Sequence, residues 1–382
     1  MDLYKFVAPE IIFGREALKQ VGESLARLGV KKVFVVSDPG VMAAGWVEKA
    51  LPYIREAGLE YRVWDDITPN PKDYEVHKGL EQYIDSGCNA VLGIGGGSPV
   101  DAAKAIALLS ANGGHISDYE GVDKIERPLP PLVAIPTTAG SGAEVTQFAV
   151  ITNSDRQMKM VIGSKSLIPD IALVDPRTLM TKDSELTANT GMDALTHAIE
   201  AFVSLAATPL TDIQAINAIK LVTQYLPVSM SNRSDLKAKE AMAMASLQAG
   251  LALSNAILGL VHAMSHQLGG LLDMPHGEAN AILLPYVMEY NLPAAIERYG
   301  EIARAMGQKT RQLSRREAAR RAVETVRELA RDIGIPDKLS QVGLTDEFIE
   351  KLSANAMQDI CLVTNPKDVL QSDVMKIFLA AL

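Results

Sequence analysis

The chain has 382 residues, which is long for one hydrophobic core and suits about two domains. With 48% apolar and 22% charged residues, its composition is that of an ordinary globular protein. The net charge of −9 argues against a nucleic-acid partner, which needs a basic surface, and no run of about 18 apolar residues suggests a membrane span. The first ten residues lack the basic and apolar segments of a signal peptide, so we expect a cytoplasmic protein.

The first half of the chain alternates between strand and helix patterns. Short β-rich runs predict buried strands at residues 32–37, 89–94, 131–136 and 171–175. Helical spacing of apolar residues predicts helices at residues 41–57, 74–86 and 99–110. This alternation indicates a parallel sheet covered by helices on both faces. Residues 147–152 and 157–163, separated by a polar turn, predict a β-hairpin late in this domain.

The second half changes to a purely helical pattern. Apolar spacings of three and four predict helices at residues 187–204, 209–225, 235–254 and 258–271. No strand is expected from about residue 180 onward, and Arg311–Asp332 is interpreted as a solvated amphipathic helix because its charges alternate in sign. We therefore predict an α/β dinucleotide-binding domain over residues 1–180 and an all-helical domain over residues 181–382.

A glycine-rich turn follows the second predicted strand. Residues 95–98 read Gly-Gly-Gly-Ser, and the pattern predicts Ser98 as a helix N-cap, with Pro99 in the first turn and Asp101 in a capping-box-like position. Free amides at such a helix start favour a diphosphate. The motif alone is weak, and a tight strand–helix turn that binds nothing explains it about as well.

A second loop, residues 136–144, follows the next strand and is rich in hydroxyls and glycine. Alone it is read as an ordinary loop, but successive carboxyl ends of parallel strands meet where open α/β sheets bind ligands. The two loops together therefore favour a nucleotide. Asp38 follows the first strand, where its carboxylate could accept a hydrogen bond from a ribose hydroxyl and repel a 2′-phosphate. This role favours NAD over NADP. Asp38 could equally be a turn residue before Pro39.

Four of the six histidines, together with one aspartate, fall in the helical half and indicate a metal site. Asp193 and His197 are four residues apart and share a helix face, as do His262 and His266, and His276 follows. Three imidazoles and a carboxylate suit a divalent first-row metal such as Fe²⁺ or Zn²⁺.

The alternative is a set of core histidines with ordinary hydrogen-bond partners, but burying five such groups without strong partners is costly. Spacing does not decide which of His262 and His266 is a ligand.

The only cysteines, Cys88 and Cys361, are far apart, which fits a reducing compartment and a site without thiols. His77 and His115 lie in the other half and are interpreted as exposed structural residues.

Taken in order, five segments resemble the iron-activated alcohol dehydrogenase family, which includes lactaldehyde reductases and 1,3-propanediol dehydrogenases. They are residues 95–104, 136–144, 191–200, 259–266 and 275–280. The resemblance spans essentially the whole chain. It implies a Rossmann-like domain and a helical domain, with the active site between them, and assembly as a homodimer or larger homo-oligomer.

The resemblance also assigns residues. It implies a bound metal, usually Fe²⁺ and sometimes Zn²⁺, with the ligands Asp193, His197, His262 and His276. His266 would line the substrate side of the pocket. Dinucleotide contacts carry over to Asp38, Asn70, Gly96, Gly97, Ser98, Asp101, Thr137, Thr138, Ser141 and Lys159.

The expected reaction is reversible oxidation of a small primary alcohol or diol to its aldehyde. The metal would act as a Lewis acid on the alcohol oxygen, the nicotinamide would accept hydride, and His266 is the candidate proton relay. A second hypothesis is a dehydroquinate synthase-like lyase, since these enzymes have a related two-domain fold. Their phosphorylated substrate needs basic residues, which the metal-site segments lack. A non-catalytic NAD-binding sensor with a structural metal is the third hypothesis.

Overall fold

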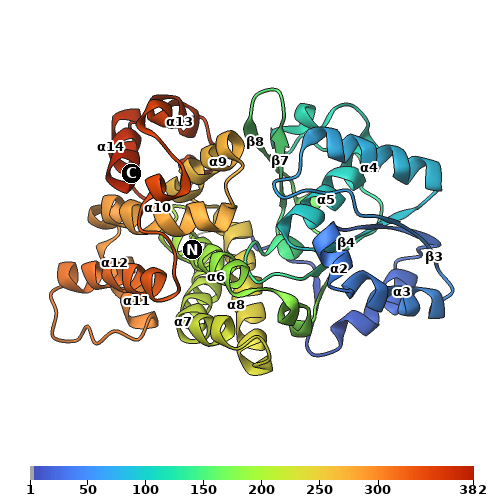
Figure 1. Ribbon diagram of the computed structural model, residues 1–382, viewed down its shortest axis with the longest axis horizontal. Helices are drawn as coiled ribbons and strands as arrows, with labels where there is room; N and C mark the ends of the chain where they lie inside the picture. Colours follow the sequence, from blue (N-terminus) through green and yellow to red (C-terminus); the bar gives the residue numbers. More distant parts are fainter. Residues whose placement is uncertain (1–3) are drawn as a thin grey trace. The chain divides into compact units, whose positions relative to one another are not determined.

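The computed structural model describes residues 4–382, which separate into two units (Figure 1). The α/β unit comprises Val7–Lys182, and the helical unit comprises Asp183–Leu382 together with residues 4–6. The expected combination of an α/β part followed by an all-helical part is confirmed.

The α/β unit is built on a six-stranded parallel sheet. Its strands are β1 (Glu10–Phe13), β2 (Lys32–Val36), β3 (Glu60–Trp64), β4 (Ala90–Gly95), β6 (Leu132–Pro136) and β9 (Ile171–Val174). They lie in the order β1-β9-β6-β4-β2-β3, and every pairing is parallel. The carboxyl ends of β6, β4, β2 and β3 therefore lie side by side at one edge of the sheet.

Helices cover both faces of this sheet, which explains its nearly continuous apolar strands. One face packs against α1 (Val21–Arg27) and α3 (Trp46–Glu56), where Val33 and Leu92 lie in the same core cluster as Ile54. The other face packs against α4 (Asp73–Ser86) and α5 (Gly97–Asn112), where Phe34 and Val91 join Ile106. Side chains that alternate along a strand thus enter two separate cores.

Two details of this unit differ from the sequence prediction. The single helix expected over residues 41–57 is two helices, α2 (Pro39–Ala43) and α3, because Gly45 adopts a left-handed φ of 76° just before Trp46. The edge strands β1 and β3 were not predicted. The hairpin is confirmed: β7 (Phe148–Asn153) pairs antiparallel with β8 (Met158–Gly163), and β5 (Gly121–Val122) adds a third strand.

The helical unit contains no strand within the described residues, as predicted. Its α-helices are α6 (Ser184–Val203), α7 (Pro209–Ser231), α8 (Leu236–Ala256), α9 (Leu260–Leu272), α10 (His276–Asn291), α11 (Ile296–Ala305), α12 (Arg315–Asp332), α13 (Ile349–Ala356) and α14 (Gln371–Ala381). Side-chain N-caps begin several of them: Asp183 accepts from Leu186 N–H, and Asp235 accepts from Ala238 N–H.

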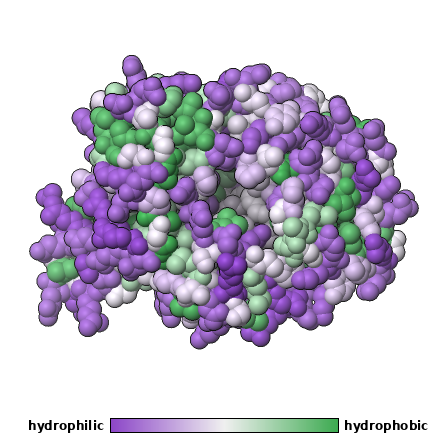
Figure 2. Space-filling model, viewed as in Figure 1, coloured by the Kyte–Doolittle hydropathy of each residue, from purple (hydrophilic) through white to green (hydrophobic). Residues whose placement is uncertain are grey.

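Helix α12 matches the amphipathic helix predicted from alternating charge. Ala319 and Val326 are buried on one side, whereas Arg321 forms a 3.0 Å ion pair with Glu324 on the exposed side. Figure 2 shows hydrophilic side chains gathered over the region of α11 and α12. Across residues 4–382 we find no individual helix with the length and hydropathy of a bilayer span; α8 and α9 meet those criteria only as a pair bent by 104°.

Candidate metal and nucleotide sites

Helix α6 carries three ionisable side chains on one face. Asp193, His197 and Glu200 are spaced by four and three residues, so they follow one another along the same side of the helix. All three are buried. Gly277 lets the start of α10 approach this helix, because a Cβ there would lie 2.3 Å from the Asn189 carbonyl oxygen.

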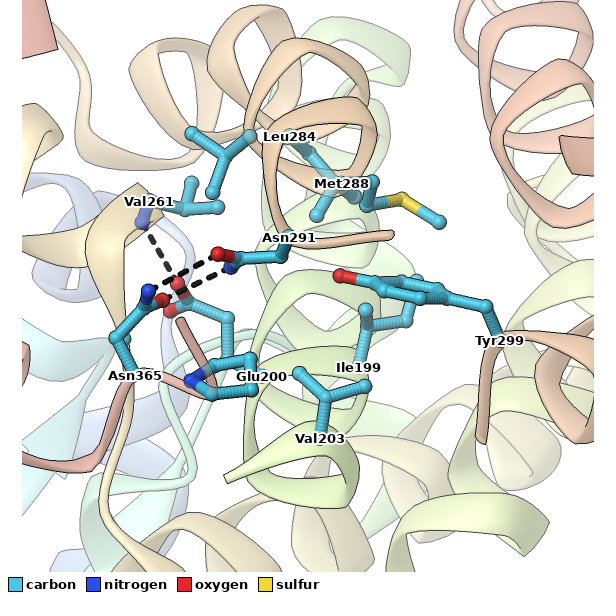
Figure 3. A pocket seen from close by; sticks show the side chains of 12 residues that line it. Ile199, Glu200, Val203, Val261, Leu284, Met288, Asn291, Tyr299 and Asn365 are labelled. Carbon is cyan, nitrogen blue, oxygen red and sulfur yellow. Dashed lines mark hydrogen bonds between the residues drawn. The ribbon is translucent and has the colours of Figure 1, made fainter. Parts of the chain in front are cut away.

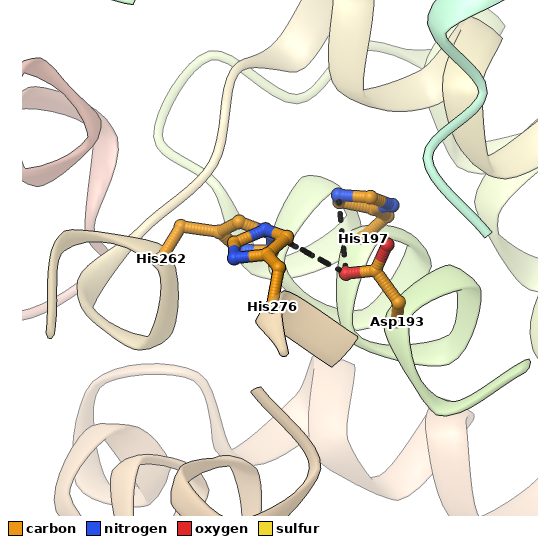
Figure 4. A group of neighbouring side chains, drawn as sticks. All are labelled: Asp193, His197, His262 and His276. Atoms are coloured by element: carbon orange, nitrogen blue, oxygen red, sulfur yellow. Dashed lines mark ion pairs between the residues drawn. The ribbon is translucent and has the colours of Figure 1, made fainter. Parts of the chain in front are cut away.

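Four side chains from three helices converge beside this face. His262 comes from the first turn of α9, and His276 is the first residue of α10 (Figure 4). The Asp193 carboxylate oxygen Oδ1 lies 3.7 Å from His197 Nε2, 3.9 Å from His262 Nε2 and 3.8 Å from His276 Nε2. One donor atom from each of the four residues lies within 4.8 Å of the others, so the group is able to hold a metal ion.

The chemistry of this group fits a cation. The amide nitrogen of Asn280 lies 2.7 Å from Asp193 Oδ1, 3.0 Å from His262 Nε2 and 3.2 Å from His276 Nε2. An amide has two hydrogens for these three acceptors. The Asn280 carbonyl oxygen is buried and has no hydrogen-bond partner among the described residues. Three acceptor atoms therefore share the two hydrogens of one amide group. A divalent cation would bind the lone pairs of all these acceptors at once.

His262 is held by a carboxylate on its other side. Its Nδ1 lies 2.5 Å from Glu200 Oε2, and Glu200 Oε1 accepts a 2.7 Å hydrogen bond from Val261 N–H. Burial, together with the neighbouring His197, lowers the pKa of His262 well below its usual value, so this imidazole is neutral at pH 7. Burial raises the pKa of Glu200 to about 7, although the N–H groups of Val261 and Gly259 favour its charged form.

His266 has a different carboxylate partner. Its Nδ1 lies 2.8 Å from Asp359 Oδ2, and Asp359 Oδ1 accepts from Cys361 N–H. Although burial opposes ionisation, His266 lowers the pKa of Asp359, so this carboxyl is charged at neutral pH. Burial and Asp359 raise the pKa of Cys361 well above its usual value, which leaves a neutral thiol. The His266 ring stacks on that of His276 with centroids 5.4 Å apart.

The two loops expected to hold a nucleotide contact one another in the α/β unit. A Cβ on Gly96 would lie 3.1 Å from Thr138 Oγ1, and one on Gly97 would lie 3.2 Å from Ser141 Oγ. No side chain caps the start of α5. The Thr137 hydroxyl is buried and lacks a hydrogen-bond partner in the described part of the chain. Free helix amides and an unsatisfied hydroxyl at one strand edge fit a phosphate-bearing ligand.

The predicted role of Ser98 as an N-cap is wrong. Helix α5 begins at Gly97 with Gly96 as its N-cap, so Ser98 lies within the first turn. Asp101 also does not cap the helix; its Oδ2 accepts a 3.1 Å hydrogen bond from Val150 N–H on β7. The three successive glycines allow the chain to turn into the helix earlier than the Ser-Pro signal indicates.

The remaining predicted nucleotide residues follow neighbouring strands or lie on the hairpin. Asp38 follows β2 and caps α2 by accepting from Val41 N–H at 2.8 Å. Asn70 follows β3 and has a positive φ of 52°. Lys159 on β8 faces Thr152 across the hairpin, and its charge acts to lower the pKa of Asp101. Burial nonetheless raises the pKa of Asp101 to about 6.

Comparison with known proteins agrees with this arrangement. A family model described as iron-containing alcohol dehydrogenase matches residues 8–176, and one described as the C-terminal part of the Fe-containing alcohol dehydrogenase family matches residues 187–382. The chain belongs to the iron-containing alcohol dehydrogenase family. The resemblance inferred from five sequence segments is thereby confirmed.

Individual members of the iron-containing alcohol dehydrogenase family match along their whole length. The NAD-dependent methanol dehydrogenase of Bacillus methanolicus is 43% identical over 377 residues, covering 99% of each chain. The lactaldehyde reductase of Escherichia coli strain K12 is 40% identical over 368 residues, covering 96% of each. A crystal structure of 1,3-propanediol oxidoreductase superposes with a TM-score of 0.97 at 42% identity, covering both chains completely.

Sequence reasoning missed three residues that contact the candidate metal ligands or His266. Glu200 follows His197 by three residues, so helical spacing was a usable signal for it. Asn280 follows His276 by four residues and had the same signal. Asp359 had no local signal, because it lies 93 residues from His266 in the chain.

The two histidines of the α/β unit behave only partly as predicted. His115 is exposed, but His77 is half-buried, and their rings stack with centroids 4.4 Å apart. Burial, and then His115, lower the pKa of His77.

Proposed function

We propose that this chain is a metal-dependent, NAD(H)-linked alcohol dehydrogenase that interconverts a small primary alcohol or diol and its aldehyde. Membership of the family supports this reaction, as do relatives named as methanol, 1,3-propanediol and lactaldehyde enzymes. The observation that carries the proposal is the convergence of one carboxylate and three imidazoles within 4.8 Å.

We assign the metal to Asp193, His197, His262 and His276, with Fe²⁺ as the expected ion and Zn²⁺ as the alternative. When bound, such a cation supplies Lewis-acid polarisation of the alcohol or carbonyl oxygen. His197 and His262 enter the site as neutral donors only if their Nε2 atoms carry no proton.

We assign NAD to the strand-end loops of the α/β unit, where it supplies the hydride acceptor. The free amides of α5 and the Thr137 hydroxyl would receive the diphosphate, and Asp38 would receive the ribose. The family's relatives support NAD as the nucleotide, and the preference over NADP is proposed from Asp38 alone.

We assign the movement of the hydroxyl proton to His266. Oxidation of an alcohol removes one proton from oxygen and one hydride from carbon, so a base must accept that proton. Asp359 occupies His266 Nδ1, which leaves Nε2 as the nitrogen able to exchange a proton. The stacking of His266 on His276 places it beside the proposed ligands without belonging to their group.

The deciding experiment follows the absorbance of NADH while ethanol, 1,2-propanediol and 1,3-propanediol are offered with and without Fe²⁺ or Zn²⁺. Metal analysis of anaerobically purified protein accompanies it. We expect metal-dependent reduction of NAD with at least one alcohol. Binding of NADH without turnover, whichever metal is added, would support the sensor hypothesis. Consumption of a phosphorylated polyol in a parallel assay, without net formation of NADH, would support the lyase. Homo-oligomeric assembly stays a prediction from the resemblance, and location in the cytoplasm stays a prediction from the sequence.

A further inference from the structure

The carboxylate of Glu200 lies at the start of helix α9, where it contacts both backbone and side chain. Gly259 precedes this helix and has no side chain to cap it; a Cβ there would lie 3.0 Å from Glu200 Oε1. Glu200 Oε1 instead accepts from Val261 N–H at 2.7 Å (Figure 3). Helix α6 therefore supplies the cap of α9.

A pair of amide side chains lies beside this carboxylate. Asn365 accepts from Leu260 N–H at 3.2 Å and pairs with Asn291 through two hydrogen bonds of 2.8 and 2.9 Å (Figure 3). The cavity beside Glu200 has a volume of about 10 Å³, which is far too small for an alcohol or a nucleotide. Glu200 is thus packed for positioning and is not placed to touch a substrate.

The second oxygen of Glu200 faces the imidazole that we assign to the metal. Oε2 lies 2.5 Å from His262 Nδ1. On the other side of the ring, the amide nitrogen of Asn280, which is only a donor, lies 3.0 Å from His262 Nε2. A neutral ring that accepts there carries its hydrogen on Nδ1 and its lone pair on Nε2. That atom is the one that faces Asp193 Oδ1 at 3.9 Å.

We propose that Glu200 is a positioning residue that selects the Nδ1-protonated tautomer of His262 and so presents Nε2 to the metal. The inference rests on the proposed metal site, but the tautomer itself is a property of the metal-free protein. Carboxylates in this position are known to orient metal-bound histidines and to strengthen metal binding.

The chain offers a matched control in the second histidine of α9. Asp359 holds His266 Nδ1 as Glu200 holds His262 Nδ1, with a separation of 2.8 Å against 2.5 Å. His266 is outside the four-residue group. Removing the charge of Asp359 therefore disturbs a second buried carboxylate–histidine pair, whose histidine is also on α9. The change alters no partner of a proposed metal ligand.

The test compares Glu200→Gln with Asp359→Asn. The glutamine keeps an acceptor for Val261 N–H but turns an amide donor toward His262 Nδ1, which moves the ring proton to Nε2. We expect the affinity for Zn²⁺, measured by competition with a chelator, to fall about 10- to 100-fold in Glu200→Gln. In Asp359→Asn it should stay near the parent value, because the partner of Asp359 is His266, which is outside the four-residue group.

A spectroscopic measurement makes the inference independent of activity. Long-range ¹H–¹⁵N correlation of the histidine rings in metal-free protein distinguishes the two tautomers. The parent protein should carry the His262 proton on Nδ1, and Glu200→Gln should carry it on Nε2. A proton on Nε2 in the parent protein would overturn the proposal even if the variant failed to fold.

Other outcomes also decide the matter. Equal losses of Zn²⁺ affinity in Glu200→Gln and Asp359→Asn would mean that general disruption of α9, and not the tautomer, causes the effect. Retained NADH binding in both variants shows that the protein is folded. Correct tautomers in a protein that never binds metal would disprove the metal site while leaving the role of Glu200 intact.

Discussion

At the scale of single residues, the two histidines of α9 differ chiefly in their partners. His262 contacts Glu200 and faces Asp193, whereas His266 contacts Asp359 and stacks on His276. Both rings have one nitrogen occupied by a carboxylate, so each is oriented for a single task at the other nitrogen.

Replacing His266 with Ala is expected to lower kcat about 10²- to 10⁴-fold, the usual range for a residue that transfers a proton. Metal content, measured on anaerobically purified protein, should stay near that of the parent. His197→Ala provides the comparison, because it should lose most of the bound metal. Loss of metal from His266→Ala would make His266 a ligand and contradict its proposed role.

Asp38 combines two roles that a pair of substitutions separates. Asn caps helices about as well as Asp, so Asp38→Asn should keep the cap on Val41 N–H while removing the negative charge. We expect the ratio of kcat/KM for NAD over NADP to fall about tenfold, equivalent to ~1.4 kcal/mol. Asp38→Ala should show the same change and lose about 1 kcal/mol of stability as well. An unchanged ratio in both variants would leave Asp38 only its capping role.

At the scale of elements, a buried charged group ties α5 to the start of the hairpin. Lys104 on α5 donates to Thr146 O at 2.9 Å and to Phe148 O at 2.7 Å, and its Nζ lies 3.9 Å from Asp101 Oδ1. Burial lowers the pKa of Lys104 to about 8. Glu144, in the loop after β6, is close enough for its charge to act on Lys104. Burial raises the pKa of Glu144 to about 7.

The Glu144 carboxyl makes the stability of the α/β unit depend on pH. Because its pKa is higher in the folded than in the unfolded chain, its favourable contribution is complete below about pH 4.5 and is lost as pH rises to about 7. Glu144→Gln should therefore gain stability relative to the parent between pH 5 and pH 8, by at most about 3 kcal/mol.

Urea unfolding followed by tryptophan fluorescence measures this difference. Both tryptophans, Trp46 and Trp64, lie in the α/β unit, so the signal reports on the unit that contains Glu144. Thr178→Val, a buried change without a titrating group, serves as the control and should shift the curves equally at both pH values. A constant difference between Glu144→Gln and the parent would contradict the raised pKa.

At the scale of the whole molecule, the proposed cation and the proposed nucleotide have separate sets of residues. The four metal candidates come from α6, α9 and α10 of the helical unit, and the nucleotide loops follow strands of the α/β unit. A cation would join three helices that otherwise meet through packing and hydrogen bonds, and it would stabilise the folded state by mass action.

Metal removal should therefore speed amide hydrogen exchange in the helical unit alone. At a metal concentration of about 100 Kd the stabilisation is ~2.7 kcal/mol, so exchange at the starts of α9 and α10 should accelerate up to about 100-fold on chelation. Amides of β2, β4 and β6 should not change. Added NADH provides the reverse comparison, since it should protect residues 95–101 and 137–141. Uniform acceleration in both units would argue for global destabilisation.

Much of the fold was predictable because the residues concerned obey short-range periodicities. Strands such as β2 and β4 are buried on both faces and read as continuous apolar runs, and their positions were predicted closely. The edge strand β3 was not predicted because it lacks such a continuous apolar run: Glu60 and Arg62 alternate with apolar residues and are exposed. The break between α2 and α3 at Gly45 was not predicted, because a single left-handed residue leaves the apolar spacing on either side nearly unchanged.

The sequence by itself determined the change from an α/β half to a helical half, the pairing of Asp193 with His197 on one helix face, and the family to which the chain belongs. All of these depend on residues within a few positions of one another or on the order of short motifs. The tertiary structure decided which α9 histidine joins that pair, and which nitrogen each ring presents. Those choices depend on Glu200 and Asp359, which lie 62 and 93 residues away in the chain, and contacts over such distances exist only after the helices have packed.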